Sequence, residues 1–296
     1  MLVSIVVATL GRPSLEDCIK SWMDQTYSAF EFIIVADGSE AKVKTERILA
    51  AIDTKDILVT VLSNTENRGA SYSYNKALEF ASCEAIALTS DDDLWLPTKL
   101  EKQILELEKG ISSVVLTGAY YRRKNKWIER PRKVISENLN PLIDVFSRRT
   151  FPWTTARYIP MSSILFRREA TIIRFDESLN GYEDFGWLHN AYIGGFKISQ
   201  LKDPLVRVNT DLARSVMREI EIDSEFITGL DKIELGMRGR FLSAHFIRPF
   251  IYQGQFNNVK KIRKEAYRNK IKTLPDFIEA VWQYSLTGMV QLIAKF

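Results

Sequence analysis

Residues 85–100 read Ala-Ile-Ala-Leu-Thr-Ser-Asp-Asp-Asp-Leu-Trp-Leu-Pro-Thr-Lys-Leu, and this stretch decides how the chain folds. Its first four residues form an apolar run, which predicts a short buried strand. Pro97 then opens a helix whose apolar positions recur at helical spacing. Three consecutive carboxylates, Asp91–Asp93, therefore lie between the end of a strand and the start of a helix.

These three adjacent carboxylates repel one another unless a cation lies among them. Mg²⁺ or Mn²⁺ carrying a diphosphate is the natural candidate, because these ions prefer hard oxygen ligands. The alternative is an ordinary helix N-terminus, where aspartate is favoured by the dipole and by unsatisfied N–H groups. One aspartate suffices for a cap, so three in succession directly after a strand favour a metal site.

The composition is that of a globular enzyme. The chain has 296 residues, 46% of them hydrophobic and 26% charged, which is enough for one large α/β domain with an added segment or for two small domains. The net charge of +4 is small, so no nucleic-acid partner is expected.

The sequence predicts a cytoplasmic protein. Cys18 and Cys83 lack metal-type spacing and are expected to be reduced. Residues 1–10 lack a basic start and a cleavage site, so they predict a first strand and not a signal peptide. No run approaches the roughly 20 apolar residues that span a bilayer, although the protein could still lie on the inner face of a membrane.

The first hundred residues alternate predicted strands and helices. Strands are expected over 2–8, 30–35, 57–62 and 85–88, and helices over 14–23, with Ser14 as the cap, 41–51 and 69–81. This alternation predicts a parallel sheet with right-handed crossovers, in which ligands bind beyond the carboxyl ends of the strands. The polar residues at those ends are Thr9, Asp37, Asn67-Arg68-Gly69 and Asp91-Asp92.

Five ordered blocks resemble glycosyltransferase family 2. They are Val-Ser-Ile-Val-Val-Ala-Thr-Leu-Gly-Arg-Pro at 3–13, Gln-Thr-Tyr at 25–27, Ile-Ile-Val-Ala-Asp-Gly-Ser at 33–39, Asn-Arg-Gly-Ala-Ser at 67–71 and Ser-Asp-Asp-Asp-Leu-Trp-Leu-Pro at 90–97. The resemblance covers about residues 1–215 and implies an α/β GT-A fold, with a Rossmann-like, mostly parallel sheet flanked by helices. It also implies a nucleotide-sugar-binding half at 1–100, an acceptor half at 101–215, and inversion of the anomeric centre.

The resemblance implies roles for four donor-site residues. Thr9 lies beside the nucleobase, and Asp37 accepts a hydrogen bond from the base, unless Asp37-Gly38-Ser39 is only a turn. Arg68 contacts the base or the diphosphate, or is an exposed loop residue. Arg214, in a late loop, closes on the diphosphate.

The resemblance also implies roles for the acidic residues. Pro97 recurs in the family five residues after the metal-binding aspartate, which makes Asp92 the ligand of Mn²⁺ or Mg²⁺ and places Asp91 near the donor ribose. Asp93 is then a flanking acid or the cap of the following helix. The metal offsets the charge of the diphosphate as the nucleotide departs.

A second acidic site is expected at Glu183-Asp184, because transfer to a hydroxyl needs a general base. The resemblance makes Asp184 that base, with Glu183 orienting it or the acceptor. The alternative is an acidic first helical turn without a catalytic role. Trp187 stacks on an acceptor sugar or is a core residue.

Residues 216–296 predict a C-terminal helical segment outside the resemblance. A basic stretch, Lys260–Lys272, precedes an apolar helix face that runs from Phe277 to Phe296. Three roles remain open for this segment, namely contact with an anionic membrane surface, packing against the core, and a homodimer interface.

The sequence therefore predicts a metal-dependent inverting glycosyltransferase. It is expected to move a sugar from a nucleotide sugar, most simply a UDP-sugar, to a hydroxyl of a glycan or lipid-linked oligosaccharide in bacterial surface polysaccharide synthesis. One alternative is a non-catalytic nucleotide-sugar- or glycan-binding protein on this fold. The other is a sugar nucleotidyltransferase, which is disfavoured because residues 9–13 hold a single glycine.

Overall fold

The computed structural model describes residues 1–54, 56–123, 126–130, 159–177, 183–209 and 256–268. The chain forms two compact units. The first comprises Met1–Pro141 with Tyr158–Glu219, and the second comprises Leu142–Arg157 with Ile220–Phe296. The predicted division between residues 215 and 216 stays a prediction.

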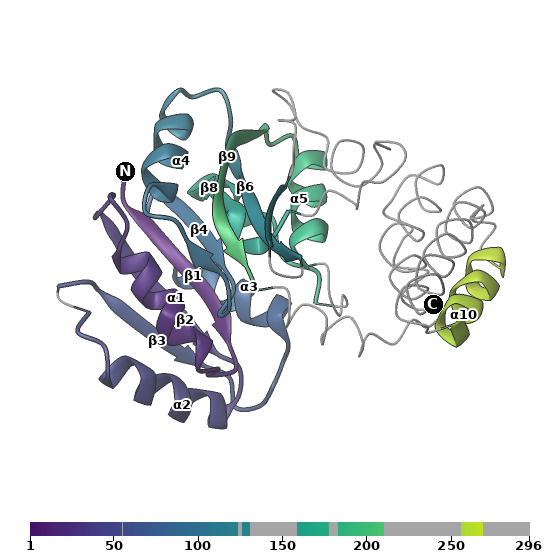
Figure 1. Cartoon of the computed structure of the whole chain (residues 1–296), viewed down its shortest axis with the longest axis horizontal. Helices are drawn as coiled ribbons and strands as arrows, with labels where there is room; N and C mark the ends of the chain where they lie inside the picture. Colours follow the sequence, from purple (N-terminus) through teal and green to yellow (C-terminus); the bar gives the residue numbers. More distant parts are fainter. Residues whose placement is uncertain (55, 124–125, 131–158, 178–182, 210–255, 269–296) are drawn as a thin grey trace, which may run out of the picture. The chain divides into compact units, whose positions relative to one another are not determined.

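The first unit is a sheet flanked by helices, and Figure 1 shows its arrangement. Its strands are β1 (Val3–Thr9), β2 (Phe30–Ala36), β3 (Val59–Ser63), β4 (Ala85–Thr89), β5 (Leu94–Trp95), β6 (Val114–Arg123), β7 (Lys126–Arg130), β8 (Ile164–Arg167) and β9 (Ile198–Val208). Its helices are α1 (Ser14–Met23), α2 (Ser39–Ala50), α3 (Ala70–Phe80), α4 (Lys99–Glu108) and α5 (Glu183–Ile193), with short 3₁₀ turns η2 (Met161–Ser163) and η3 (Arg168–Ile172). The described helix of the second unit is α10 (Phe256–Arg268).

The sheet has the order β3-β2-β1-β4-β8-β6-β9-β5, with β7 paired to β6. The first four strands in this order are parallel, as the apolar runs predict, and β9 is parallel to β6. β8 runs antiparallel between β4 and β6. The carboxyl ends of β1, β2, β3 and β4 therefore meet at one edge, which confirms the predicted location of the polar residues.

The predicted strands and helices of the first hundred residues are present, with their ends displaced by one or two residues. One cap assignment is wrong. Ser14 is the first residue of α1 and does not cap it, because Pro13 precedes the helix and no side chain forms a cap hydrogen bond. The φ of Pro13 is −56°, so its ring already has the geometry of a helix start.

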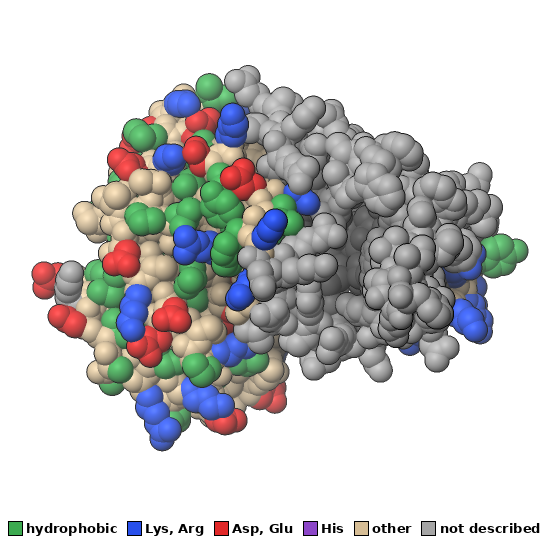
Figure 2. Space-filling view, viewed as in Figure 1, with side chains coloured by type: hydrophobic (Ala, Val, Ile, Leu, Met, Phe, Trp, Pro, Cys, Tyr) green, Lys and Arg blue, Asp and Glu red, His purple; other side chains and the backbone are tan. Residues whose placement is uncertain are grey.

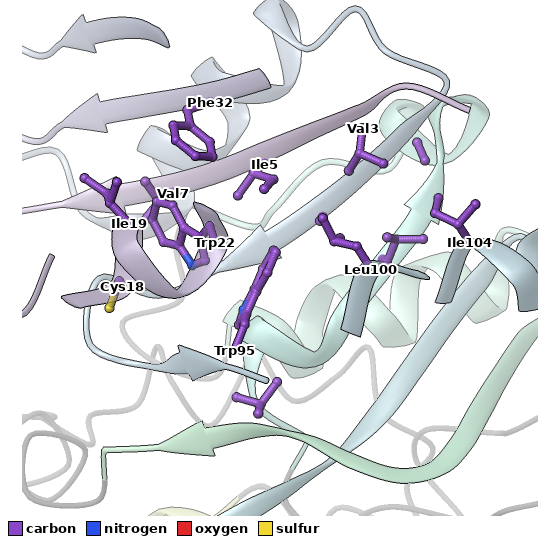
Figure 3. Packing of buried hydrophobic residues seen from close by; sticks show 14 of the residues in the cluster. Val3, Ile5, Val7, Cys18, Ile19, Trp22, Phe32, Trp95, Leu100 and Ile104 are labelled. Carbon is purple, nitrogen blue, oxygen red and sulfur yellow. The ribbon is translucent and has the colours of Figure 1, made fainter. Parts of the chain in front are cut away.

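One continuous core lies between the sheet and helices α1 and α4, as Figure 3 shows. Val3, Ile5 and Val7 project from one face of β1 toward this core, because alternate residues of a strand share a face. The Trp22 ring of α1 packs against Phe32 with ring centroids 5.6 Å apart and against Trp95 at 6.0 Å. Burial of these large rings fixes α1 and the segment after β4 relative to β1.

A lysine is buried in this core at the start of α4. Lys99 is fully buried, its Nζ donates to Gln103 Oε1 at 2.8 Å, and it lies 3.8 Å from the centre of the Trp95 ring. Burial lowers the pKa of Lys99 well below its usual value, because the charged ammonium loses its hydration. At pH values between the lowered pKa and the ordinary pKa of lysine, the unfolded chain therefore binds a proton that the folded chain does not bind.

Lys99→Met should remove this source of pH dependence. The stability of the wild type relative to the variant should rise by about 1.4 kcal/mol per pH unit, from the lowered pKa up to about pH 10.4. Urea unfolding at several alkaline pH values measures the difference. Lys109→Met, at an exposed position, is the control and should leave the slope unchanged. A wild-type slope equal to that of Lys99→Met would show that Lys99 is charged in the folded protein.

Candidate active site

Asp91 is held by the loop that follows β1. β4 lies beside β1, so residues beyond the ends of both strands are neighbours. Thr9 Oγ1 donates to Asp91 Oδ2 at 2.7 Å, and Arg12 Nη1 forms an ion pair with Oδ1 at 3.0 Å. Thr9 and Asp91 are both buried, so the described role of Thr9 is to orient this carboxylate. Contacts of Thr9 with a nucleobase and of Asp91 with a ribose stay predictions.

Asp93 joins three segments that are distant in sequence. It is buried, and its carboxylate accepts hydrogen bonds from Ser162 Oγ at 2.7 Å and from the Asn209 backbone N–H at 3.1 Å. The Ser162 hydroxyl also accepts from the Ser90 N–H at 3.0 Å. Burial raises the pKa of Asp93 to about 6 against the lowering effect of these two donors. Asp93 does not cap α4, whose N-cap is Thr98, so that alternative is wrong.

Asp92 lies between these two braced acids and is half-buried. Within the described ranges, no other side chain forms a hydrogen bond with its carboxylate. Burial, followed by the charges of Asp93 and Asp91, raises the pKa of Asp92 to about 7. A cation beside Asp92 would offset this repulsion.

The donor set fits a divalent metal that is shared with a substrate. Mg²⁺ commonly takes one or two carboxylates and completes its shell with water and phosphate oxygens. In the described parts of the chain, no group of three His, Cys, Asp or Glu side chains is placed to hold an ion by itself. Asp92 would thus hold Mg²⁺ or Mn²⁺ together with a diphosphate.

Asp37 connects the end of β2 to the loop before α3. Its Oδ1 accepts from Asn64 Nδ2 and from the Arg68 N–H, and its Oδ2 accepts from the Gly69 N–H, each at 2.8 Å. Gly69 has a φ of +84°, a conformation that favours glycine, and α3 begins at the next residue. Asp37 therefore shapes this loop and is more than a turn residue, while its contact with a base stays a prediction.

Arg68 extends from the same loop. Its side chain is exposed, and the guanidinium carbon lies 4.2 Å from the centre of the Tyr72 ring, which restrains it by a cation–π contact. The site thus has a restrained cation beside the Asp37 loop, as a contact with a base or phosphate requires. The contact itself stays a prediction.

The second acidic site begins α5. Asp184 is buried, and its Oδ1 accepts from the Phe185 N–H at 2.8 Å. Burial and the charges of Asp93 and Asp184 raise the pKa of Tyr121 well above its usual value, so this phenol lies within electrostatic range of both acids. The pKa of Tyr74 is also raised well above its usual value, by burial and by charges that include those of Asp91 and Glu183. The two acidic sites, predicted separately, are therefore within electrostatic range of the same two phenols.

Trp187 has no access to a sugar, so its assignment to the acceptor is wrong. The side chain is fully buried, and its Nε1 donates to the Ile173 carbonyl at 3.0 Å. Its ring packs at 4.5 Å from Phe166 and at 6.1 Å from Phe175. Trp187 instead anchors α5, and with it Asp184, to the sheet.

Two residues of α3 belong to the site although the sequence assigned them no role. The Tyr74 hydroxyl donates to the Thr89 carbonyl at 2.7 Å, directly before the acidic residues. Asn75 Nδ2 donates to Glu177 Oε1 at 2.8 Å, and its Oδ1 accepts from the Phe175 N–H at 2.8 Å. α3 thereby links the donor half to the segment that leads to Asp184.

Two predictions lie outside the described residues, namely the role of Arg214 and the apolar helix face from Phe277 to Phe296. Among the described helices, none combines the length and apolar character required to cross a membrane.

Known proteins resemble this chain in sequence. An uncharacterized glycosyltransferase of Methanocaldococcus jannaschii, MJ1057, is 39% identical over 109 residues, or 36% of this chain and 37% of that protein. The Escherichia coli UDP-Glc:alpha-D-GlcNAc-diphosphoundecaprenol beta-1,3-glucosyltransferase WfgD is 31% identical over 113 residues, or 38% of this chain and 43% of that protein. This chain thus spans about two fifths of the length of these relatives.

Solved structures agree with the fold. S. aureus TarS 1-349 in complex with UDP superposes with a TM-score of 0.56 at 17% identity, over 91% of this chain and 92% of that one. The mannosyltransferase PcManGT of Pyrobaculum calidifontis, in complex with GDP-Man and Mn²⁺, gives a TM-score of 0.53 at 15% identity, over 95% of this chain and 86% of that one. The sheet and its flanking helices form the GT-A fold. The family model for "Glycosyl transferase family 2" matches residues 4–172, more than half of the chain, and the protein belongs to that family.

Proposed function

We propose that this protein is a metal-dependent inverting glycosyltransferase that uses Asp92 to hold the metal and Asp184 as the general base. The observation that carries the proposal is that both acidic sites act electrostatically on the same two phenols, Tyr74 and Tyr121. Asp92 lies in a block whose other two acids are braced by the protein, and Asp184 shares the neighbour Tyr121 with that block. Folding alone does not require so many carboxylates together, because each must be desolvated.

The donor is most simply a UDP-sugar. WfgD uses UDP-Glc, as its name states, and TarS was solved with UDP and with UDP-GlcNAc. PcManGT, which is less similar to this chain, was solved with GDP-Man and Mn²⁺. The carboxylate of Asp37 and the restrained guanidinium of Arg68 provide an acceptor and a donor near the ends of β2 and β3, where the base would bind.

Transfer would proceed by a single displacement. Asp184 removes the proton from an acceptor hydroxyl, whose oxygen forms a bond to the anomeric carbon from the side opposite the nucleotide. The bond from that carbon to the diphosphate oxygen breaks, and the nucleoside diphosphate leaves with the bonding electrons. Asp92 would hold a divalent metal, whose positive charge would stabilise the leaving diphosphate. Arg12, paired to Asp91, keeps a second cation at the same edge of the sheet.

The acceptor we propose is a hydroxyl of a glycan or of a lipid-linked oligosaccharide in surface polysaccharide synthesis. The name of WfgD describes a lipid diphosphate-linked sugar as its acceptor, and that of another E. coli relative, WcaA, refers to colanic acid synthesis.

A panel of UDP-, GDP- and dTDP-sugars with Mn²⁺ tests this proposal. A donor at about 100 times its Kd stabilises the folded state by about 2.7 kcal/mol, which should raise the Tm by roughly 5 to 10 °C. UDP-sugars should give this shift, and the donor that gives it should release its nucleoside diphosphate once an acceptor is added. The proposal fails if no nucleotide sugar raises the Tm.

A further inference from the structure

One face of α10 carries an exposed row of cations. Among the side chains of this helix that the structure describes, the exposed ones are Lys260, Lys261, Lys264, Tyr267 and Arg268, whose spacing places them on one side of a helix. The opposite side is anchored in the protein, since Ile262 and Ala266 are fully buried. These two apolar side chains are thus already packed within the protein, and the basic side faces outward.

α10 is strongly basic for its length. α10 contains five basic residues and one glutamate, a net charge of +4. The whole chain, with 41 basic and 37 acidic residues, also has a net charge of +4. The net charge of this 13-residue helix is therefore as large as that of the whole chain. Figure 2 shows Lys and Arg side chains gathered where Figure 1 places α10.

The lysines of α10 also differ from those on the helices of the first unit. There, exposed lysines are paired with acids one turn away, as in Lys20–Glu16, Lys42–Glu46, Lys44–Glu40 and Lys109–Glu106. On α10, no ion pair links Lys260, Lys261 or Lys264 to an acidic side chain that the structure describes. Their positive charge is therefore available to an external anion.

We infer that the basic face of α10 docks the protein on the surface of an anionic lipid bilayer. The row from Lys260 to Arg268 extends over about 12 Å of helix, so its cations can contact several head groups at once. Tyr267, 85% exposed at the edge of this face, is an aromatic residue with a polar tip, a type that suits the boundary between head groups and acyl chains. The buried side of the helix excludes deep insertion, so attraction between charges should dominate the binding.

This inference goes beyond the proposed transfer reaction, because binding to a bilayer requires neither donor nor acceptor. It can fail while transfer to a water-soluble acceptor persists, and transfer can fail while membrane binding persists.

Co-sedimentation of the full chain with vesicles tests the inference. Binding is measured with phosphatidylcholine vesicles, with and without phosphatidylglycerol, at low salt and at about 1 M salt, where the Debye length is about 3 Å. The wild type should bind only the anionic vesicles, and only at low salt. The triple variant Lys260→Gln, Lys261→Gln, Lys264→Gln should lower the partition coefficient on the order of 100-fold, because each lysine near the surface contributes about fivefold.

A matched control separates this face from total charge. The triple variant Lys20→Gln, Lys42→Gln, Lys44→Gln removes the same charge from α1 and α2 and should bind vesicles nearly as well as the wild type. The inference is overturned if the control loses as much binding as the α10 variant, or if the wild type ignores anionic vesicles. It is likewise overturned if the wild type binds a soluble polyanion such as heparin but no vesicles, or if the α10 variant instead dissociates a dimer in ultracentrifugation. Circular dichroism melting confirms that both variants fold.

Discussion

Asp92→Ala should abolish sugar transfer without destabilising the protein. The carboxylate is half-buried beside two other acids, and burial together with their repulsion raises its pKa to about 7. Loss of this charge relieves repulsion, so the Tm should stay the same or rise. Transfer should fall on the order of 10³-fold or more, because a metal contributes several kcal/mol of charge stabilisation at the leaving group. Activity and thermal unfolding, measured on the same preparation, give both results.

Two comparisons make the Asp92 result specific. Asp56→Ala removes an exposed carboxylate from a turn. It should change neither the rate of transfer nor the Mn²⁺-dependent binding of the nucleotide. Asp93→Ala should lower the Tm, because Ser162 Oγ and the Asn209 N–H lose their acceptor, and it should reduce transfer much less than Asp92→Ala. A result in which Asp93 is indispensable and Asp92 is dispensable would place the metal ligand one residue later.

The parallel half of the fold was predictable because its signal is local. The runs at β1 and β4 are apolar without alternation, which is typical of strands covered on both faces. Apart from the local hairpin of β6 and β7, the antiparallel pairings were not predicted, since their partners are distant in sequence. β5 has only two residues and pairs with Val206 and Arg207, more than a hundred positions away. No periodicity within so short a segment indicates such a partner.

The candidate site was likewise predictable only in part. Motif order identified the acidic residues, but the side chains that brace them come from elsewhere in the chain. Ser162 reads as an ordinary strand residue and lies in a 3₁₀ turn, 69 residues from its partner Asp93. Arg12 could have been found, because a parallel β1–β4 pair places the residues that follow each strand side by side. The burial of Trp187 in the core could not have been predicted, since an aromatic residue on a helix can face either a pocket or the core.

Asp184→Asn should stop chemistry while leaving donor binding intact. A hydroxyl is a poor nucleophile, so loss of its proton acceptor should slow transfer by a factor on the order of 10² to 10⁴. The amide keeps the shape of the side chain, and its oxygen can still accept from the Phe185 N–H, so α5 should begin as in the wild type. The Tm shift produced by the nucleotide sugar should therefore be unchanged, and kcat should carry the whole loss.

Two further variants separate the base from the donor site. Glu183→Gln, at the preceding residue, controls for charge in the first turn of α5 and should retain most of the turnover. Asp37→Asn should have the opposite effect to Asp184→Asn. In the wild type the Arg68 and Gly69 N–H groups donate to two different oxygens of Asp37, whereas asparagine has only one acceptor oxygen. Asp37→Asn should therefore weaken donor binding more than it lowers kcat at saturation. Near-normal turnover of Asp184→Asn at saturating substrates would exclude Asp184 as the base, and a collapse in Glu183→Gln would then transfer that role to Glu183.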